Sequence, residues 1–167
     1  AYDPIEIAIK EYCNSKKAIR KKIEITKEYA FTPETKMTGQ IIDNKLLCVK
    51  GAYESVLPLC NLEQEIYNKI KDKIDNYSKE GFRVLAVAKQ NNLETIPSTL
   101  FESKLDFEGL IALYDPPRYG VKTSLSECYS AGVRVIMITG DNGETAKGIA
   151  KKINLENYEQ VITGNEL

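Results

Sequence analysis

The sequence contains no histidine, so it lacks the side chain that most often acts as a general base or binds a metal near neutral pH. Any chemistry must rest on aspartate, glutamate, lysine, serine, threonine or cysteine. The cysteines are few and dispersed, and no pair has zinc-finger or redox-motif spacing, which predicts reduced cytosolic thiols. They are Cys13, Cys48, Cys60 and Cys128.

Long apolar runs and an excess of one charge are also missing. The most apolar stretch, residues 133–139, is far shorter than the roughly 20 residues that cross a bilayer, and the first residues show no signal-peptide pattern. The 23 basic and 24 acidic residues leave a formal net charge of −1, so no global field attracts nucleic acid or an anionic membrane. We therefore expect a soluble chain that is not inserted in a membrane and has no nucleic-acid partner.

The first part of the sequence predicts an antiparallel sheet with flanking helices. Asp3 is a helix N-cap before Pro4, and the helix should run to about Asn14. Strand patterns follow at residues 23–25, 39–42 and 46–49, with a hairpin turn at 43–45. Apolar residues then recur every three or four positions from Leu62 until Gly81 ends that helix, and residues 82–88 return to a strand.

From about residue 107 the pattern changes to alternating strands and helices. Strands are predicted at 107–114, 133–139 and 160–163, with helices at 120–131 and 142–153 between them. Such an alternation is typical of a parallel α/β unit with right-handed crossovers. We place the domain boundary at the loop 91–104, which gives a first domain at 1–104 and a second at 105–167.

Two groups of residues in the second part could carry chemistry. Thr139, Gly140 and Asp141 end an apolar strand and lead into a helix, where open α/β sheets bind ligands and helix N-termini favour phosphate. A simple turn with a helix cap explains them equally well. Asp115 and Arg118 flank two prolines after the preceding strand, and the guanidinium suits a phosphate or a structural carboxylate. A plain strand-to-helix connector is the alternative.

Three residues of the first part suggest a nucleotide site, and each has a structural alternative. Lys50 ends a strand and is followed by two small residues that leave room for a base or ribose, although a surface lysine has the same pattern. Phe31 could stack on adenine or belong to the core. Arg83 lies among apolar residues of a strand, where it must reach a ligand, solvent or a salt-bridge partner.

Taken together and in order, four segments resemble the signature motifs of P-type cation-transporting ATPases. The likeness covers nearly the whole chain and is closest to bacterial calcium-type pumps. The segments are Lys50-Gly51-Ala52-Tyr53-Glu54, residues 81–88, Asp115-Pro116-Pro117-Arg118 and residues 137–142.

The resemblance implies an α/β fold: an α+β nucleotide-binding domain with an antiparallel sheet, followed by part of a haloacid-dehalogenase-like parallel α/β phosphorylation domain. It implies a longer parent on the cytoplasmic side of a membrane, which forms an aspartyl-phosphate and pumps cations. Its partners would be ATP and the remaining cytoplasmic and transmembrane domains of that pump. The start of the chain at a helix cap and its end inside an α/β unit also suggest a piece of a longer protein.

The resemblance also implies roles for individual residues. Phe31 would stack on adenine, Glu6 would hydrogen-bond near the base, and Arg83 would approach the phosphates. The remaining positions would line the pocket or pack on the nucleoside. The full nucleotide set is Glu6, Phe31, Lys36, Lys50, Gly51, Arg83 and Leu85.

In the second part, the resemblance places Thr139, Gly140 and Asp141 at the edge where the γ-phosphate and a Mg²⁺ ion arrive. They would support catalysis there, while Asp115 and Arg118 would give structural support. No residue of the chain would bind a metal of its own.

The departures from the family pattern limit what the chain can do. It lacks the Asp-Lys-Thr-Gly-Thr motif of the phosphorylated aspartate and the Gly-Asp-Gly-x-Asn-Asp motif that holds magnesium. We therefore expect no ATP hydrolysis by this chain, and Asp141 is not the nucleophile. Tyr53 stands where the family usually has proline. The alternatives are a haloacid-dehalogenase-type phosphatase, which would need an aspartate nucleophile motif, and a non-catalytic interaction module.

Overall fold

The computed structural model describes residues 3–18, 23–164 and 166. The chain begins with α1 (Pro4–Ser15), and the Asp3 carboxylate accepts a hydrogen bond of 2.9 Å from the Ile5 amide. Since the first amides of a helix have no partner within it, this contact caps the helix. The predicted N-cap and helix are confirmed.

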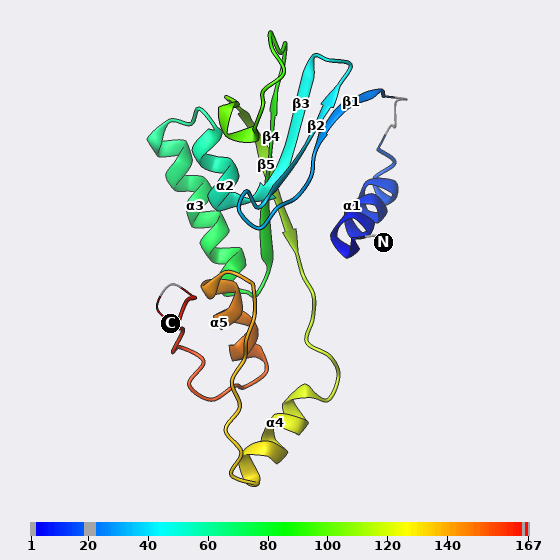
Figure 1. Ribbon diagram of the computed structural model, residues 1–167. Coiled ribbons are helices and arrows are strands. Elements are labelled where there is room, and N and C mark those ends of the chain that lie inside the picture. Colours follow the sequence, from blue (N-terminus) through cyan, green and yellow to red (C-terminus); the bar gives the residue numbers. More distant parts are fainter. Residues whose placement is uncertain (1–2, 19–22, 165, 167) are drawn as a thin grey trace.

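A five-stranded antiparallel sheet forms the centre of the first part, with its strands in sequence order (Figure 1). The strands are β1 (Ile25–Tyr29), β2 (Met37–Ile42), β3 (Leu46–Ala52), β4 (Arg83–Gln90) and β5 (Asp106–Leu113). Asp43 and Asn44 join β2 to β3 with φ angles of 50° and 55°, the left-handed geometry of a tight hairpin turn. The predicted hairpin and antiparallel sheet are confirmed.

Helices cover one face of this sheet and bury every second strand residue beneath them. They are α2 (Tyr53–Val56), the 3₁₀ turn η1 (Leu57–Leu59) and α3 (Gln64–Lys79). The core under them includes Met37, Ile41, Leu47, Val49, Ile74, Val84, Ala86 and Ala88. Because strand side chains alternate between faces, the residues between these positions lie on the opposite face, which α2, η1 and α3 leave uncovered (Figure 1).

The last strand differs from the prediction. The sequence pattern predicts that residues 107–114 begin a parallel sheet, but β5 pairs antiparallel with β4, with Leu85 opposite Ile111. The connection 91–105 contains the 3₁₀ turn η2 (Leu100–Glu102), and both Leu100 and Leu105 are buried in the same core. That burial brings the chain back beside β4, so the strand is antiparallel. β5 belongs to the sheet although it lies beyond the division drawn at residues 104 and 105.

The segment after β5 contains the two predicted helices, α4 (Val121–Ser130) and α5 (Gly143–Lys152). The predicted strands at 133–139 and 160–163 are wrong, because neither range is a strand in the described chain. Ile136 and Ile138 are 66% and 94% exposed. A strand needs a neighbour to pair with its backbone groups, and the one sheet of the described residues does not extend to this segment.

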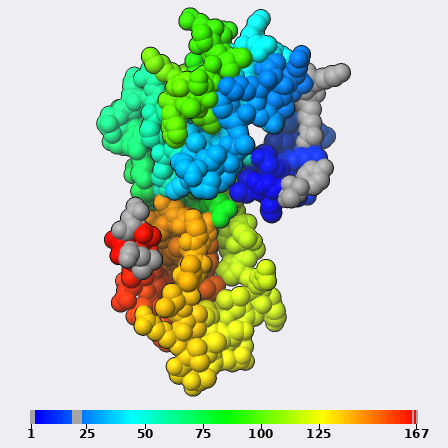
Figure 2. Space-filling model, viewed as in Figure 1, coloured from blue at the N-terminus to red at the C-terminus, as the bar shows by residue number. Residues whose placement is uncertain are grey.

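α5 packs against the end of α3 and the turn that leads into β4 (Figure 2). A Cβ atom added at Gly148 would lie 2.6 Å from the Gly81 amide nitrogen, so only glycine allows this approach. The Thr145 hydroxyl, on a residue that is 3% exposed, donates a hydrogen bond of 3.0 Å to the Phe82 carbonyl. The two parts of the chain are therefore in tight contact.

Candidate functional site

The uncovered face of the sheet carries Lys50 and Leu85 on neighbouring strands. Lys50 lies between Thr38 of β2 and Val87 of β4 in the strand register. Leu85 lies between Ala52 of β3 and Ile111 of β5, and all of these side chains are partly exposed. Their register gives a small apolar surface with a lysine at its side.

Glu6 reaches this face from the first turn of α1. Its carboxylate forms an ion pair with the Lys50 ammonium group. The Lys50 side chain is 21% exposed and that of Glu6 is 56% exposed, so the lysine is largely covered and the carboxylate is not. The structure thus brings together two residues of the expected nucleotide set that are far apart in the sequence.

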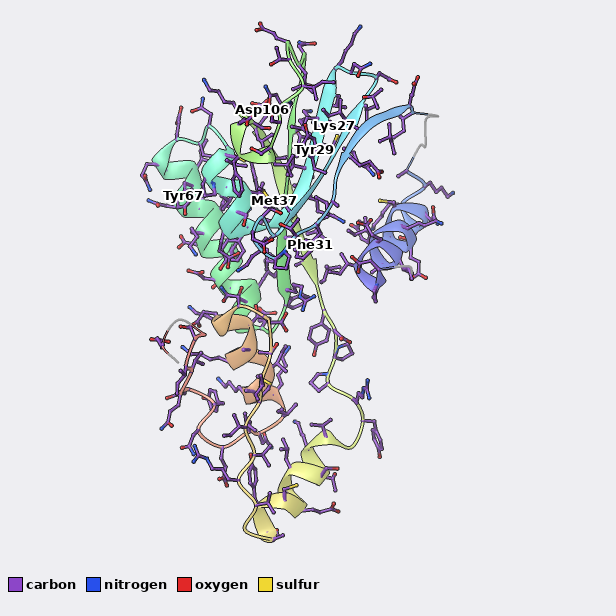
Figure 3. The ribbon with its side chains drawn as sticks, in the orientation of Figure 1. Lys27, Tyr29, Phe31, Met37, Tyr67 and Asp106 are labelled. Carbon is purple, nitrogen blue, oxygen red and sulfur yellow. The ribbon has the colours of Figure 1, made fainter. Side chains whose placement is uncertain are left out.

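Phe31 lies in the loop between β1 and β2 and is not a core residue. It is 60% exposed, and Figure 3 labels it near the lower end of the sheet in that view. Leaving an aromatic ring exposed to water costs free energy relative to burying it. Its exposure leaves the side chain accessible to a ligand.

Lys36, directly before β2, and Gly51 of β3 lie in close backbone contact. Lys36 has a φ of 51°, and its carbonyl accepts a hydrogen bond of 2.9 Å from the Ala52 amide. A Cβ atom at Gly51 would lie 2.5 Å from the same carbonyl oxygen. Glycine at position 51 is thus required by the neighbouring backbone, whatever a ligand needs there.

Arg83 and Asp141 form an ion pair, which is the alternative that the sequence left open for this arginine. The Arg83 Nε donates to Asp141 Oδ1 at 2.9 Å, and Nη2 donates to the same oxygen. The other carboxylate oxygen accepts from the Thr139 hydroxyl at 3.2 Å, while that hydroxyl accepts from the Asp141 amide. Gly140 is exposed between them. The Thr-Gly-Asp turn is therefore held at the start of β4.

Asn142 is a residue whose contacts sequence reasoning missed. Its side chain caps α5 by accepting from the Glu144 amide, and it donates to the Tyr53 hydroxyl and to Glu54 Oε1 at 3.2 and 2.9 Å. Burial and then the adjacent Glu54 carboxylate raise the pKa of Tyr53 above its ordinary range, so the hydroxyl stays protonated. The sequence pattern predicts a helix from residue 142 but assigns no role to the side chain there, and Tyr53 lies 89 residues away.

Asp115 and Arg118 lie in the connection from β5 to α4. Arg118 lines a cavity of about 590 Å³ together with Tyr114, Lys122 and Lys152. The Lys152 ammonium group lies 4.3 Å from the centre of the Tyr114 ring. Within the described residues, no ion pair joins Arg118 to the Thr-Gly-Asp turn, so its supporting role stays a prediction.

The described part of the chain offers no metal site or membrane span. It has no cluster of three or more cysteine, aspartate or glutamate side chains placed to hold a metal ion. It also has no helix that is long and apolar enough to cross a bilayer.

Comparison with known proteins identifies the relatives of this chain. The family model for P-type ATPase cytoplasmic domain N matches residues 1–120. The chain is 35% identical to the sodium/potassium exporting P-type ATPase cta3 of Schizosaccharomyces pombe, over 92% of this chain and 17% of that protein. It is 35% identical to a probable cation-transporting P-type ATPase of Mycoplasma genitalium, over 99% of this chain and 20% of that protein.

A bacterial calcium pump is also among the relatives. The calcium-transporting ATPase 1 of Bacillus cereus is 33% identical over 99% of this chain and 21% of its own length. This chain thus spans about a fifth of the length of the curated relatives it matches. These matches confirm the resemblance drawn from the four motifs. The chain belongs to the P-type ATPase family, and the part it matches is the cytoplasmic domain N.

Proposed function

We propose that this chain binds ATP on the uncovered face of its sheet and presents it to a phosphorylation site elsewhere in a longer cation-transporting ATPase. The observation that carries the proposal is the Lys50–Glu6 ion pair beside the apolar surface around Leu85. A lysine held in place next to an open apolar patch suits a flat, polar-edged ring such as adenine. The exposed ring of Phe31 supports the same interpretation.

The energetic contributions can be ordered. Stacking of a base on Phe31 contributes about 1 to 3 kcal/mol by analogy with base stacking elsewhere. Burial of the adenine ring against the apolar surface around Leu85 contributes about 25 cal/mol per Å² of apolar surface removed from water. The partly buried Lys50 adds donors whose position is already fixed by Glu6, which lowers the entropy lost on binding.

We further propose that Arg83 contacts the phosphates of the bound nucleotide. Its side chain is 52% exposed, and its bonds to Asp141 use only Nε and Nη2. A guanidinium has five donor hydrogens, so donors remain for a phosphate oxygen while the ion pair persists. Thr139, Gly140 and Asp141 would then lie on the phosphate side of the nucleotide.

We propose that magnesium-dependent ATP hydrolysis is an activity of the longer parent protein. The described residues offer no cluster that fits a Mg²⁺ site of its own, so we propose that the ion arrives bound to ATP and supplies charge neutralisation at its phosphates. Without the phosphorylated aspartate motif, this chain does not hydrolyse ATP. Hydrolysis through an aspartyl-phosphate and cation movement need the remaining cytoplasmic and transmembrane domains. The division drawn at residues 104 and 105 would then move past β5, so that the sheet up to Leu113 belongs to the nucleotide side of that assembly and the segment after it to the phosphorylation side.

Titration of the isotope-labelled chain with ATP, followed by NMR amide shifts, tests the proposal. We expect shifts around Phe31, Lys50 and Leu85, and an affinity that falls at least about fivefold in Phe31→Ala, the factor given by 1 kcal/mol of stacking. Lys50→Ala should weaken binding as well. Phe101→Ala is the matched control, because Phe101 is 55% exposed and lies in η2, outside this set.

Two outcomes would contradict the proposal. One is the absence of any shift at several millimolar ATP, which would favour the interaction-module hypothesis. The other is a set of shifts that Phe31→Ala and Phe101→Ala weaken equally, which would place the nucleotide elsewhere on the surface.

A further inference from the structure

The side chain of Asn142 makes hydrogen bonds in two directions at once. Its oxygen accepts from the Glu144 amide inside α5, and its nitrogen donates to Tyr53 and Glu54 at the start of α2. An asparagine amide has one acceptor oxygen and two donor hydrogens. Both ends of this amide are therefore engaged. Its oxygen bonds to the second part of the chain, and its nitrogen bonds to the first part.

We propose that Asn142 is a positioning residue, which fixes the Thr-Gly-Asp turn relative to the strand that carries Lys50. Tyr53 and Glu54 are the hydrogen-bond acceptors that hold it. The connection is short on both sides. Asn142 directly follows Asp141, and Tyr53 directly follows the last residue of β3. Holding these points together fixes the spacing between the two halves of the nucleotide site, a role that rests on the function proposed above.

Tyr53, one of the two acceptors for Asn142, is largely enclosed. Tyr53 is 9% exposed and is packed under the Lys71 ammonium group, which lies 5.0 Å from the centre of its ring. A proline at this position, as in the resembled family pattern, has no hydroxyl and could not accept this hydrogen bond. The tyrosine contact is thus a property of this chain.

The rest of α5 supports the same docked position. Thr145 bonds the Phe82 carbonyl and Gly148 fits against Gly81, so the helix contacts the α3–β4 turn along its inner side. Asn142 differs from these contacts in position, because it acts at the end of the helix nearest the Thr-Gly-Asp turn. Its loss should free that end first.

The substitution Asn142→Asp separates docking from capping. Aspartate keeps an oxygen that accepts from the Glu144 amide, so α5 stays capped. It loses the donor and places a carboxylate against Glu54, which opposes docking. The double variant Asn142→Asp with Glu54→Gln exchanges the two groups, so that a side-chain amide at position 54 donates to a carboxylate at position 142. Glu54→Gln alone keeps the acceptor oxygen and serves as the matched control.

Residual dipolar couplings of the α3 and α5 amides, measured without nucleotide, report whether the two helices move as one body. We expect one alignment tensor to fit both helices in the wild-type chain and in Glu54→Gln. Asn142→Asp should require two tensors while the α5 amide shifts stay helical, and the exchanged double variant should return to one. Tyr53→Phe should have a smaller effect in the same direction, because Glu54 remains as an acceptor.

The proposal is overturned if Asn142→Asp still fits one tensor, since the amide donor would then be dispensable. It is also overturned if the double variant shows no recovery, including the case in which Asn142→Asp unfolds α5 itself, because the effect would then be one of helix stability. No nucleotide is present in this experiment. Its result therefore stands apart from the ATP titration, and either proposal can fail alone.

Discussion

An apolar, strand-like sequence forms a strand in the first part of this chain but not in the second. In the sheet, β3 is paired on both sides, and Leu47 and Val49 are buried under the helices. Residues 133–139 are at least as apolar, yet Ile138 is 94% exposed and the segment forms no strand. The difference lies in the neighbours. Strand formation needs partners for backbone groups and a surface for side chains, which local sequence does not supply.

Hydrogen exchange should show the largest difference between the two parts. We expect amides of β3, which is paired on both sides, to open only by global unfolding. Global unfolding of ordinary domains costs about 5 to 15 kcal/mol, so their protection should reach about three orders of magnitude or more. Amides of residues 136–138 should exchange at close to the rate of an unfolded chain. Strong protection of 136–138 would mean that this segment has a strand partner, such as a second copy of the chain.

Paired truncations should sharpen the same comparison. Ile74→Ala removes a side chain that is 0% exposed in the α3 core, and we expect it to lower the free energy of unfolding by about 2 to 5 kcal/mol. Ile138→Ala should change it by no more than about 0.5 kcal/mol, because almost nothing is buried there. Urea denaturation measures both. Equal costs for the two substitutions would contradict the exposed placement of Ile138.

A thiol in the sheet part gives a smaller, pH-dependent test. Burial, followed by the Asp106 carboxylate, raises the pKa of Cys60 to about 11. Compared with the ordinary value of 9.0, this should slow alkylation of Cys60 near pH 8.5 about a hundredfold relative to the urea-unfolded chain. Because the folded pKa is the higher one, the linked stability is present below pH 9 and is lost as pH rises through about 11. Equal rates in folded and unfolded protein would show that Cys60 is accessible.

Local signals in the sequence predicted most elements of the sheet part, although the first strand was placed at 23–25 and β1 covers Ile25–Tyr29. The Asp3 cap, the hairpin at Asp43 and Asn44, and the α3 helix ended by Gly81 all depend on residues close together in the chain. The direction of β5 was not predictable in this way. It depends on burial of Leu100 and Leu105 in a core built from distant residues, and no periodicity within residues 107–114 encodes that.

In the candidate site, too, local features were predictable from the sequence and contacts between distant residues were not. The sequence singled out Arg83 as a charge that needs a partner, and the resemblance grouped Lys50 with Glu6, but neither the Asp141 partner nor the Lys50–Glu6 ion pair was identified. The contact between Asn142 and Tyr53 was not predicted at all. Pairings between such distant residues follow from how α5 docks on the α3–β4 turn, which is a property of packing.

The docking amide of Asn142 has a chemical weakness, because the next residue is Gly143. Glycine has no side chain to hinder attack of its backbone nitrogen on the asparagine amide carbon. That attack expels ammonia, and hydrolysis of the resulting ring leaves aspartate or isoaspartate. We expect aged preparations to contain this form, detectable by mass spectrometry of the peptide around residue 142, and to lose the single-tensor fit as it accumulates. The docked arrangement of the two parts is therefore limited in time by the rate of Asn142 deamidation, in addition to its equilibrium stability.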